Sequence, residues 1–157
     1  MLSGCGCVCV QDKEARRKMT STVDALNRLW TKTADMSRKV DGVIGTIHGI
    51  GLTEYMVLRQ IADSQDKVMR RIDLASAIGR TASGVTRLLA PMEKIGLVKR
   101  VDNPRDARVS LITITKAGEQ ILCDATETIN HHTDKLFRHL TVQQLSNLMK
   151  TLDLIDA

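Results

Sequence analysis

The sequence predicts a mainly helical fold with one small β-hairpin, and two features of its patterning indicate this. Apolar residues recur at the 3.6-residue spacing of amphipathic helices through most of the 157 residues. Only between residues 97 and 114 does the spacing change to the two-residue alternation of strands. At this length one domain with a sizeable core is expected, and we assign it to residues 19–157.

Positive charge is concentrated in one part of the chain. The formal net charge is +5, and residues 67–108 hold ten Lys and Arg against four Asp and Glu, a local excess of +6. A basic segment indicates a polyanionic partner, although a solvated charged surface is the ordinary alternative. Trp30, Tyr55 and Phe137 are too few aromatic residues for a base-stacking surface that binds single strands or RNA. Duplex DNA is therefore the favoured polyanion.

The N-terminal segment is unusual because Cys5, Cys7 and Cys9 alternate with small or β-branched residues. Residues 2–5, LSGC, look like a lipoprotein box, but no basic and apolar segment precedes them, which argues against export. The three thiols could instead hold a soft metal ion or form a disulfide with another chain. The interpretation we favour is a disordered leader over residues 1–18. With no signal sequence and no apolar run of the roughly 18 residues that a membrane helix needs, we expect a cytoplasmic protein without a membrane partner.

Residues 19–43 predict a long amphipathic helix. Its apolar positions follow helical spacing. They are Val23, Leu26, Trp30, Ala34, Ser37, Val40 and Ile44. Glycines at 42, 45, 49 and 51 are expected to end it. A second helix is expected over residues 52–62, with Thr53 as N-cap and Tyr55, Leu58 and Ile61 facing inward, and a polar loop over residues 63–68 follows.

Residues 71–96 indicate two short helices joined by a tight turn. The first has an apolar stripe, and Gly79 can take the positive φ that ends it. That stripe is formed by Ile72, Leu74, Ala75 and Ile78. Thr81 can cap the second helix. The buried side of the second helix is formed by Val85, Leu88, Leu89 and Met92.

The opposite side of that second helix carries small or hydrogen-bonding groups and one guanidinium. These residues are Ala82, Ser83, Thr86 and Arg87. Such a surface fits a DNA major groove, so we interpret the pair as a helix-turn-helix. Pro91 removes one helical hydrogen bond and is expected to kink the second half of the helix.

Two strands are expected at residues 97–101 and 109–114, joined by a polar turn over residues 102–108. Arg105 and Arg108 in this turn could reach phosphates or enter a narrow minor groove. Asp102 or Asp106 would pair with one of them and hold the loop in shape. A charged hairpin tip is commonly only solvated. Directly after a helix-turn-helix, however, it is typical of a wing.

Two further helices complete the chain, the first beginning at Thr115 and ending near His139, and the second capped by Thr141. Their apolar positions are Ile121, Leu122, Ala125, Ile129, His132, Leu136, Leu145, Leu148, Met149, Leu152 and Ile155. Together with the N-terminal helix they offer more apolar surface than one small winged domain can cover. This surplus predicts a dimer.

The order of elements and several segments resemble the MarR family of winged helix-turn-helix regulators. The matching segments are GLTEYMVLRQIA (51–62), RRIDLASAIGRTASGVTRLLAPMEKIGLVKR (70–100), NPRDARVSLITITKAGEQI (103–121) and HLTVQQLSNLMKTLD (139–153). The resemblance covers about residues 20–156. It implies six helices in a triangular homodimer, with residues 52–115 as the winged domain and 19–45 and 116–156 as dimerisation helices. It also implies a bacterial or archaeal protein that binds a palindromic operator and usually represses.

The resemblance carries functional positions over residue by residue. Ser83, Thr86 and Arg87 match base- and phosphate-contacting positions, and Arg108 matches the wing arginine, with Asp106 as its partner. Ala107 stands where the family often has a basic residue, which leaves Arg105 as the substitute. The candidate DNA-binding residues are therefore Arg71, Arg80, Thr81, Ser83, Gly84, Thr86, Arg87, Arg105 and Arg108.

The resemblance further implies control by a small aromatic or lipophilic ligand or by thiol oxidation. Trp30, His48 and Met56 are candidate ligand contacts, and each fits ordinary packing equally well. Cys123 is a redox candidate with Cys5, Cys7 and Cys9, although such a residue is more often a small buried hydrophobe. Cys123 and His131 lie two helical turns apart, but no pair has the i, i+4 spacing of a helical metal motif, so no metal site is expected.

These patterns favour a homodimeric, sequence-specific DNA-binding regulator, most simply a repressor that a small ligand releases. The alternatives are a regulator that senses thiol oxidation and an architectural DNA-binding protein without sequence preference. We find no Ser/His/Asp order, phosphate loop or paired-carboxylate site. An enzyme and a cofactor are therefore not expected.

Overall fold

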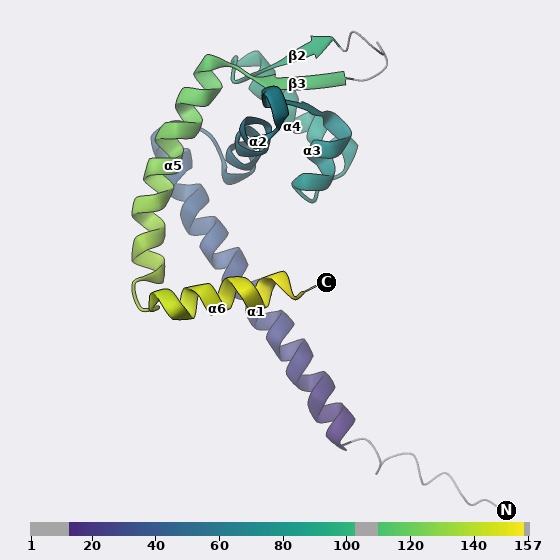
Figure 1. Cartoon of the computed structure of the whole chain (residues 1–157), viewed down its shortest axis with the longest axis vertical. Helices are drawn as coiled ribbons and strands as arrows, with labels where there is room; N and C mark the ends of the chain where they lie inside the picture. The colour runs from purple at the N-terminus through teal and green to yellow at the C-terminus, as the bar shows by residue number, and fades with distance from the viewer. Residues whose placement is uncertain (1–12, 103–109, 156–157) are drawn as a thin grey trace, which may run out of the picture. The chain divides into compact units, whose positions relative to one another are not determined.

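The computed structural model describes residues 13–102 and 110–155, with side chains from residue 22 onward. The helices are α1 (Lys13–His48), α2 (Leu52–Asp63), α3 (Arg71–Ala77), α4 (Ala82–Lys94), α5 (Lys116–Phe137) and α6 (Val142–Asp153). The strands are β1 (Val68–Arg70), β2 (Val98–Asp102) and β3 (Ser110–Ile114), and a single 3-10 turn, η1, spans Gln65–Lys67 (Figure 1). The mainly helical class with a small wing sheet is thus confirmed. The chain divides into two compact units, residues 1–38 and 39–157.

Helix α1 is longer than the sequence pattern predicts at both ends. It begins at Lys13, inside the expected leader, and ends at His48. Gly42 and Gly45 lie within the helix and do not end it, whereas Gly49, with a φ of +68°, follows it directly. Two glycines in a 36-residue helix cost too little to outweigh the burial of Ile44 between them. The remaining leader residues and the three N-terminal cysteines lie outside the described range.

The expected N-cap of α2 is wrong. Gly51 is the N-cap residue and has no side chain that could cap the helix, and Thr53 lies inside the helix as its second residue. Instead, the backbone N–H of Leu52 donates to Oδ1 of Asp41, over 2.6 Å. Asp41 lies eleven residues earlier, on α1, so no local sequence signal indicates it.

The sheet has one strand more than the sequence predicts. Its order is β1-β3-β2, and both pairs are antiparallel, with Val98 opposite Ile114 and Met69 opposite Ile112. Strand β1 begins at Val68, the last residue of the expected loop, and continues to Arg70 directly before α3. It was missed because three residues are too few to show an alternating pattern.

Among the side chains that the structure describes, those of the core all lie in the unit of residues 39–157. Its buried side chains come from the end of α1, from α2 to α5 and from the sheet. They include Ile44, Val57, Leu58, Ile61, Leu74, Val85, Leu89, Met92, Val98 and Ile112. Ile72 contradicts the expected stripe of α3, since 65% of it is exposed, while Leu74 and Ala75 of that stripe are buried.

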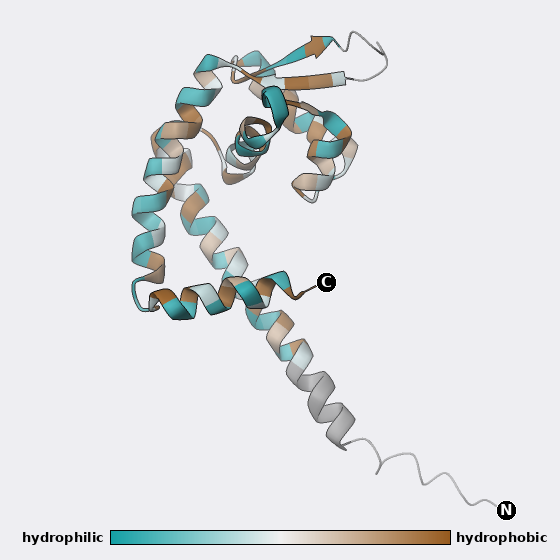
Figure 2. Ribbon diagram, viewed as in Figure 1, coloured by the Kyte–Doolittle hydropathy of each residue, from teal (hydrophilic) through white to brown (hydrophobic). Residues whose placement is uncertain are grey.

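The last two helices begin where the sequence predicts. Thr115 accepts a hydrogen bond from the backbone of Gly118 at the start of α5. Thr141 and Gln144 form a reciprocal capping box at the start of α6. No residue of α6 is buried, and Figure 2 shows apolar residues along this helix. Among the described helices, none has the length and apolar character to cross a membrane.

Candidate nucleic-acid interface

The turn between α3 and α4 is built as its sequence predicts. Gly79 has a φ of +62°, and the following backbone N–H, of Arg80, donates to the carbonyl of Ala75 over 2.9 Å. The hydroxyl of Thr81 accepts from the N–H of Gly84 over 3.1 Å and so caps α4. Thr81 and Gly84 are therefore occupied in shaping the turn, and they fix the direction of α4.

The side of α4 opposite the core is exposed and polar. Val85, Leu89 and Met92 are buried, whereas Ser83, Thr86 and Arg87 are exposed. The Thr86 hydroxyl donates to the carbonyl of Ala82 over 2.9 Å. Its oxygen still has a lone pair that can accept from a base or from a protein group. The hydroxyls of Ser83 and Thr81 lie 3.2 Å apart.

Arginines flank this side of α4. Arg80 and Arg87 are exposed and line a groove of about 440 Å³ between the start of α2 and α4. The groove is also lined by Thr53, Glu54, Gly84, Leu88 and Pro91. Within the described ranges, neither arginine has an ion pair. Arg71, the first residue of α3, is half-buried.

A third exposed arginine near α4 is engaged differently. Nε of Arg100, on β2, donates to Oε1 of Glu93, on α4, over 2.9 Å. This hydrogen bond raises the pKa of Arg100 above its ordinary value. The pair ties the wing sheet to α4, so Arg100 is less available to an anion than Arg87 is.

Helix α4 continues through Pro91 to Lys94. The carbonyl of Pro91 accepts from the N–H of Ile95 over 3.0 Å, so the last turn is hydrogen-bonded. Proline has no N–H to donate, and the carbonyl of Arg87 therefore lacks its usual helical donor. Pro91 does not end the helix that carries the exposed side chains.

The wing is described only at its base. Asp102 is exposed at the end of β2, opposite Ser110 of β3. Arg105, Asp106, Ala107 and Arg108 lie outside the described residues. Their roles, and the pairing of Asp102 with a wing arginine, stay predictions.

The three candidate ligand residues have different surroundings. Nε2 of His48 lies 2.8 Å from the Thr128 hydroxyl, which links the end of α1 to α5. Met56 is exposed on α2. Trp30 is 76% exposed and belongs to the unit of residues 1–38. His48 is thus explained by a contact between two helices, and a common ligand site for the three residues stays a prediction.

Cys123 is exposed on α5, which contradicts its expected place as a small buried hydrophobe. Position 123 lies at the edge of the apolar stripe, next to half-buried Leu122. At such an edge, helical periodicity does not decide whether a residue is buried or exposed. In the described part of the chain, no group of three or more His, Cys, Asp or Glu side chains could hold a metal ion.

A pair of helices joined by a tight turn, an exposed polar surface on the second helix and an antiparallel hairpin directly after it define a winged helix-turn-helix protein. Residues 50–110 match the model of the MarR family. Over this segment the chain is similar to the MarR family, and the similar proteins described next are transcriptional regulators.

Similar proteins come from Escherichia coli. The chain is 26% identical to the HTH-type transcriptional regulator PapX over 97 residues, which are 62% of this chain and 59% of PapX. It is 36% identical to the transcriptional regulator HosA of strain O111:H- over 72 residues, which are 46% of this chain and 52% of HosA. The chain thus spans little more than half the length of these curated relatives.

The fold is shared with a solved structure of a mutant MarR from E. coli complexed with operator DNA. The TM-score is 0.77 at 20% identity, and the match covers 87% of this chain and 96% of the MarR chain.

Proposed function

We propose that this chain is a homodimeric, sequence-specific regulator that binds double-stranded DNA. The single observation that carries the proposal is the exposed side of α4, where hydroxyls and an arginine without an ion pair among the described residues stand opposite a buried apolar side. The shape of a helix fits the major groove, and an arginine there can bind guanine through two hydrogen bonds. The MarR relative complexed with operator DNA supports the same use of this fold.

The remaining candidate residues take defined roles in this proposal. Arg71, at the start of α3, and Arg80, in the turn after it, contact phosphates and set the position of the protein on the duplex. Arg105 and Arg108 enter the minor groove from the wing, held in shape by Asp102 and Asp106. Thr81 and Gly84 act indirectly, because their hydrogen bond sets the direction of α4.

The dimer is supported by apolar side chains that the single chain leaves exposed. On α6 these are Val142, Leu145, Leu148, Met149 and Leu152, and within residues 22–38 they are Val23, Leu26, Leu29 and Trp30. A second copy would cover them and present two copies of α4 to a palindromic operator.

Selection of bound duplexes from a random pool tests sequence-specific recognition. In competition, the protein should bind the selected duplex more tightly than random duplex. Equal binding of the two duplexes would favour architectural binding without sequence preference. On the selected site, Arg87→Ala should weaken binding by about 1–3 kcal/mol if its contact is to a base. Unchanged affinity and salt dependence would exclude Arg87 as a contact.

Arg59→Ala is the matched control, because it also removes one guanidinium charge but at a position away from α4. The guanidinium of Arg59, on α2, donates to the Tyr55 hydroxyl, which lies 3.2 Å from the hydroxyl of Thr126 on α5. Arg59 is thus held on the side of α2 that faces α5, away from the groove beside α4. Arg59→Ala should lower DNA affinity much less than Arg87→Ala.

We further propose that the regulator is a cytoplasmic repressor that a small aromatic or lipophilic ligand releases, with Trp30, His48 and Met56 as contacts. Trp30 is the only tryptophan, so its fluorescence reports ligands that reach it. Control by thiol oxidation is the second candidate, because the exposed Cys123 is accessible to oxidants. Oxidation should then abolish selected-site binding in the natural chain but not in Cys123→Ser.

A further inference from the structure

The ion pair between Glu93 and Arg100 joins the last turn of α4 to the wing sheet. Nε of Arg100 donates to Oε1 of Glu93 over 2.9 Å, and only 23% of the Glu93 side chain is exposed, so this carboxylate is largely enclosed. A backbone link precedes the pair, because the N–H of Leu97 donates to the carbonyl of Met92 over 2.9 Å. The ion pair is therefore a second link between the same two segments, farther along the chain toward the wing loop.

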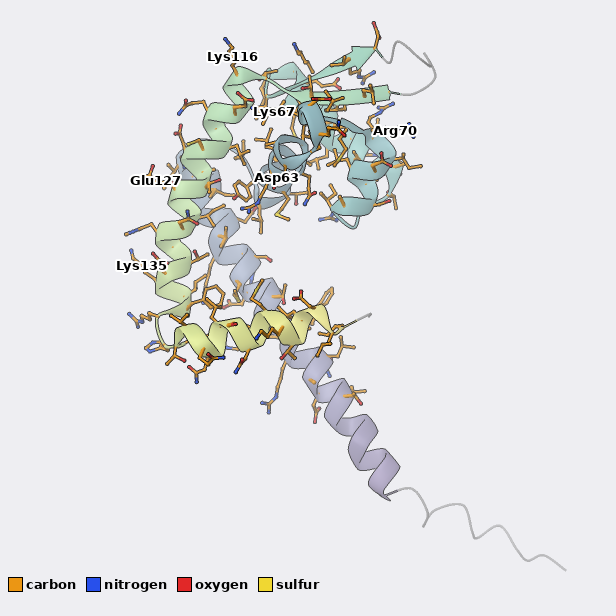
Figure 3. The ribbon with its side chains drawn as sticks, viewed as in Figure 1. Asp63, Lys67, Arg70, Lys116, Glu127 and Lys135 are labelled. Atoms are coloured by element: carbon orange, nitrogen blue, oxygen red, sulfur yellow. The ribbon has the colours of Figure 1, made fainter. Side chains whose placement is uncertain are left out.

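Arg100 occupies the middle of the wing sheet. It lies opposite Ile112 of β3, which is fully buried, so the two side chains share the side of the sheet that faces the core. Strand β1 pairs with β3 as far as Arg70, toward the Asp102 end of the sheet (Figure 3). Beyond Arg70 the described sheet continues as two strands, β2 and β3, to Asp102. The ion pair thus holds β2 from the side of α4 just before the sheet narrows.

The charge of Glu93 is unfavourable for DNA binding at this place. Glu93 is the one acidic residue of α4, and it follows Thr86 by about two helical turns, so it shares the side of the helix that carries Thr86. A carboxylate there repels the phosphates of a duplex. The pair also occupies a guanidinium that could bind a phosphate. By charge alone, the pair contributes nothing to DNA affinity.

We propose that Glu93 is a positioning residue for the wing: it holds Arg100, and with it β2, at a fixed angle to α4, so that α4 and the wing reach the same duplex. The inference rests on the proposed function, because it concerns how two parts of one DNA-binding surface are held together. A charge-assisted hydrogen bond gives such a link a defined geometry. An exposed ion pair adds little to stability, so its effect belongs in DNA affinity rather than in unfolding.

Glu93→Gln tests this role, because charge and position predict opposite signs. The variant removes a negative charge, so electrostatics alone would tighten binding to the selected duplex. Loss of the fixed angle should instead weaken binding about threefold to tenfold, as expected when each subunit of a dimer loses one exposed ion pair. Urea denaturation should show the same cooperative transition as in the natural chain. Equal or tighter binding by Glu93→Gln would overturn the inference.

The double variant Glu93→Gln with Arg100→Gln has the natural net charge and lacks the pair. It should bind about as weakly as Arg100→Gln alone, because the two side chains act through one link. Independent effects would bring the double variant back to the affinity of the natural chain. That result would make Arg100 an ordinary phosphate contact and would refute the positioning role.

Glu54→Gln is the matched control. Glu54 lines the groove beside α4 together with Arg87, and among the described residues it has no ion pair. This variant removes the same charge close to α4 and leaves the link to β2 intact, so it should bind the selected duplex at least as tightly as the natural chain. Equal weakening by Glu54→Gln and Glu93→Gln would contradict the assignment to the pair.

A substitution in the wing separates positioning from a general effect on α4. Arg105→Ala with Arg108→Ala should weaken binding by the natural chain and should have a smaller effect in the Glu93→Gln chain, where the wing no longer docks. Equal effects in both chains would show that Glu93 does not act through the wing. No effect in the natural chain would also refute the inference.

Amide hydrogen exchange in the free protein reports the link without DNA. The amides of β2 should exchange faster in Glu93→Gln than in the natural chain, and those of α2 should not change. Unchanged exchange in β2 would contradict the link itself. A natural chain that binds no selected duplex would refute the proposed function. A natural chain that binds, with a Glu93→Gln chain that binds equally well, would refute only the positioning role of Glu93.

Discussion

Gly118 shows how one residue sets the approach of α5 to the sheet. A Cβ at this position would collide with the backbone carbonyl of Leu97 and would lie 2.8 Å from a side-chain carbon of Ile114. The same carbonyl accepts a hydrogen bond from the N–H of Thr115 over 3.0 Å. Gly118→Ala should therefore lower the free energy of unfolding by about 2–3 kcal/mol, since backbone cannot move as a flexible side chain does. Urea denaturation followed by circular dichroism measures this.

Gly42→Ala is the control for that substitution. Gly42 lies inside α1, and a Cβ there would meet nothing within 4 Å. Alanine is the better helix former by about 0.5–1 kcal/mol, so this variant should be slightly more stable than the natural chain. A loss of similar size in both variants would show that the close approach at Gly118 has no particular cost.

The sequence alone shows the motif around Gly118 but not the physical reason for it. The pattern Ile-Thr-x-x-Gly at residues 114–118 is part of the family resemblance, and Thr115 was predicted as the start of a helix. What could not be predicted is the partner of Gly118, because Leu97 lies 21 residues earlier and is brought there only by the pairing of β2 with β3.

At the scale of elements, Pro91 is the residue that fits its helix least well. Its ring leaves the carbonyl of Arg87 without a helical donor, although α4 continues to Lys94. Pro91→Ala should raise the free energy of unfolding by about 1–3 kcal/mol, because proline is the least favourable residue in a helix interior. Chemical denaturation at a fixed protein concentration provides the measurement.

Pro91→Gly separates the loss of the ring from the gain of helix propensity. Glycine restores the N–H but is about 1 kcal/mol less favourable than alanine in a helix, so its effect should be intermediate. Lower stability in Pro91→Ala would mean that packing of the ring against the groove beside α4 outweighs the missing hydrogen bond. Selected-site affinity of Pro91→Ala would then show whether the proline also affects docking.

The sequence predicts those helix starts that depend on residues close together in the chain. Thr81, Thr115 and Thr141 cap α4, α5 and α6 because each hydroxyl reaches an N–H three residues later. The cap of α2 by Asp41, and the existence of β1, depend on tertiary contacts and were missed. The same distinction holds for the site. The exposed side of α4 follows from helical periodicity, whereas the groove beside it requires α2 and α4 to lie next to each other.

At the scale of the whole molecule, helix α6 has apolar side chains that do not pack into the core of the single chain. Among the described side chains, every buried apolar one lies between Val40 and Ala125, and α6 contributes none. Exposed leucines on this helix do not stabilise a monomer. Each Å² of their apolar surface contributes about 25 cal/mol only when a partner covers it. The second copy proposed above is such a partner, and it would double the number of DNA-contacting helices.

A charge placed on this side of α6 tests the assembly. Leu148 and Leu152 lie one helical turn apart and are both exposed in the single chain. The double change Leu148→Glu and Leu152→Glu should convert a dimer into a monomer in sedimentation velocity, because it buries two unpaired carboxylates at the contact. Affinity for a selected palindrome should fall by about a hundredfold or more, since the two half-sites are then bound independently.

Gln143→Glu is the control, because it adds charge to the same helix at an exposed polar position, and this variant should remain dimeric. A double variant that stays dimeric would place the contact between copies elsewhere than on α6, and a monomer with full palindrome affinity would separate DNA binding from assembly.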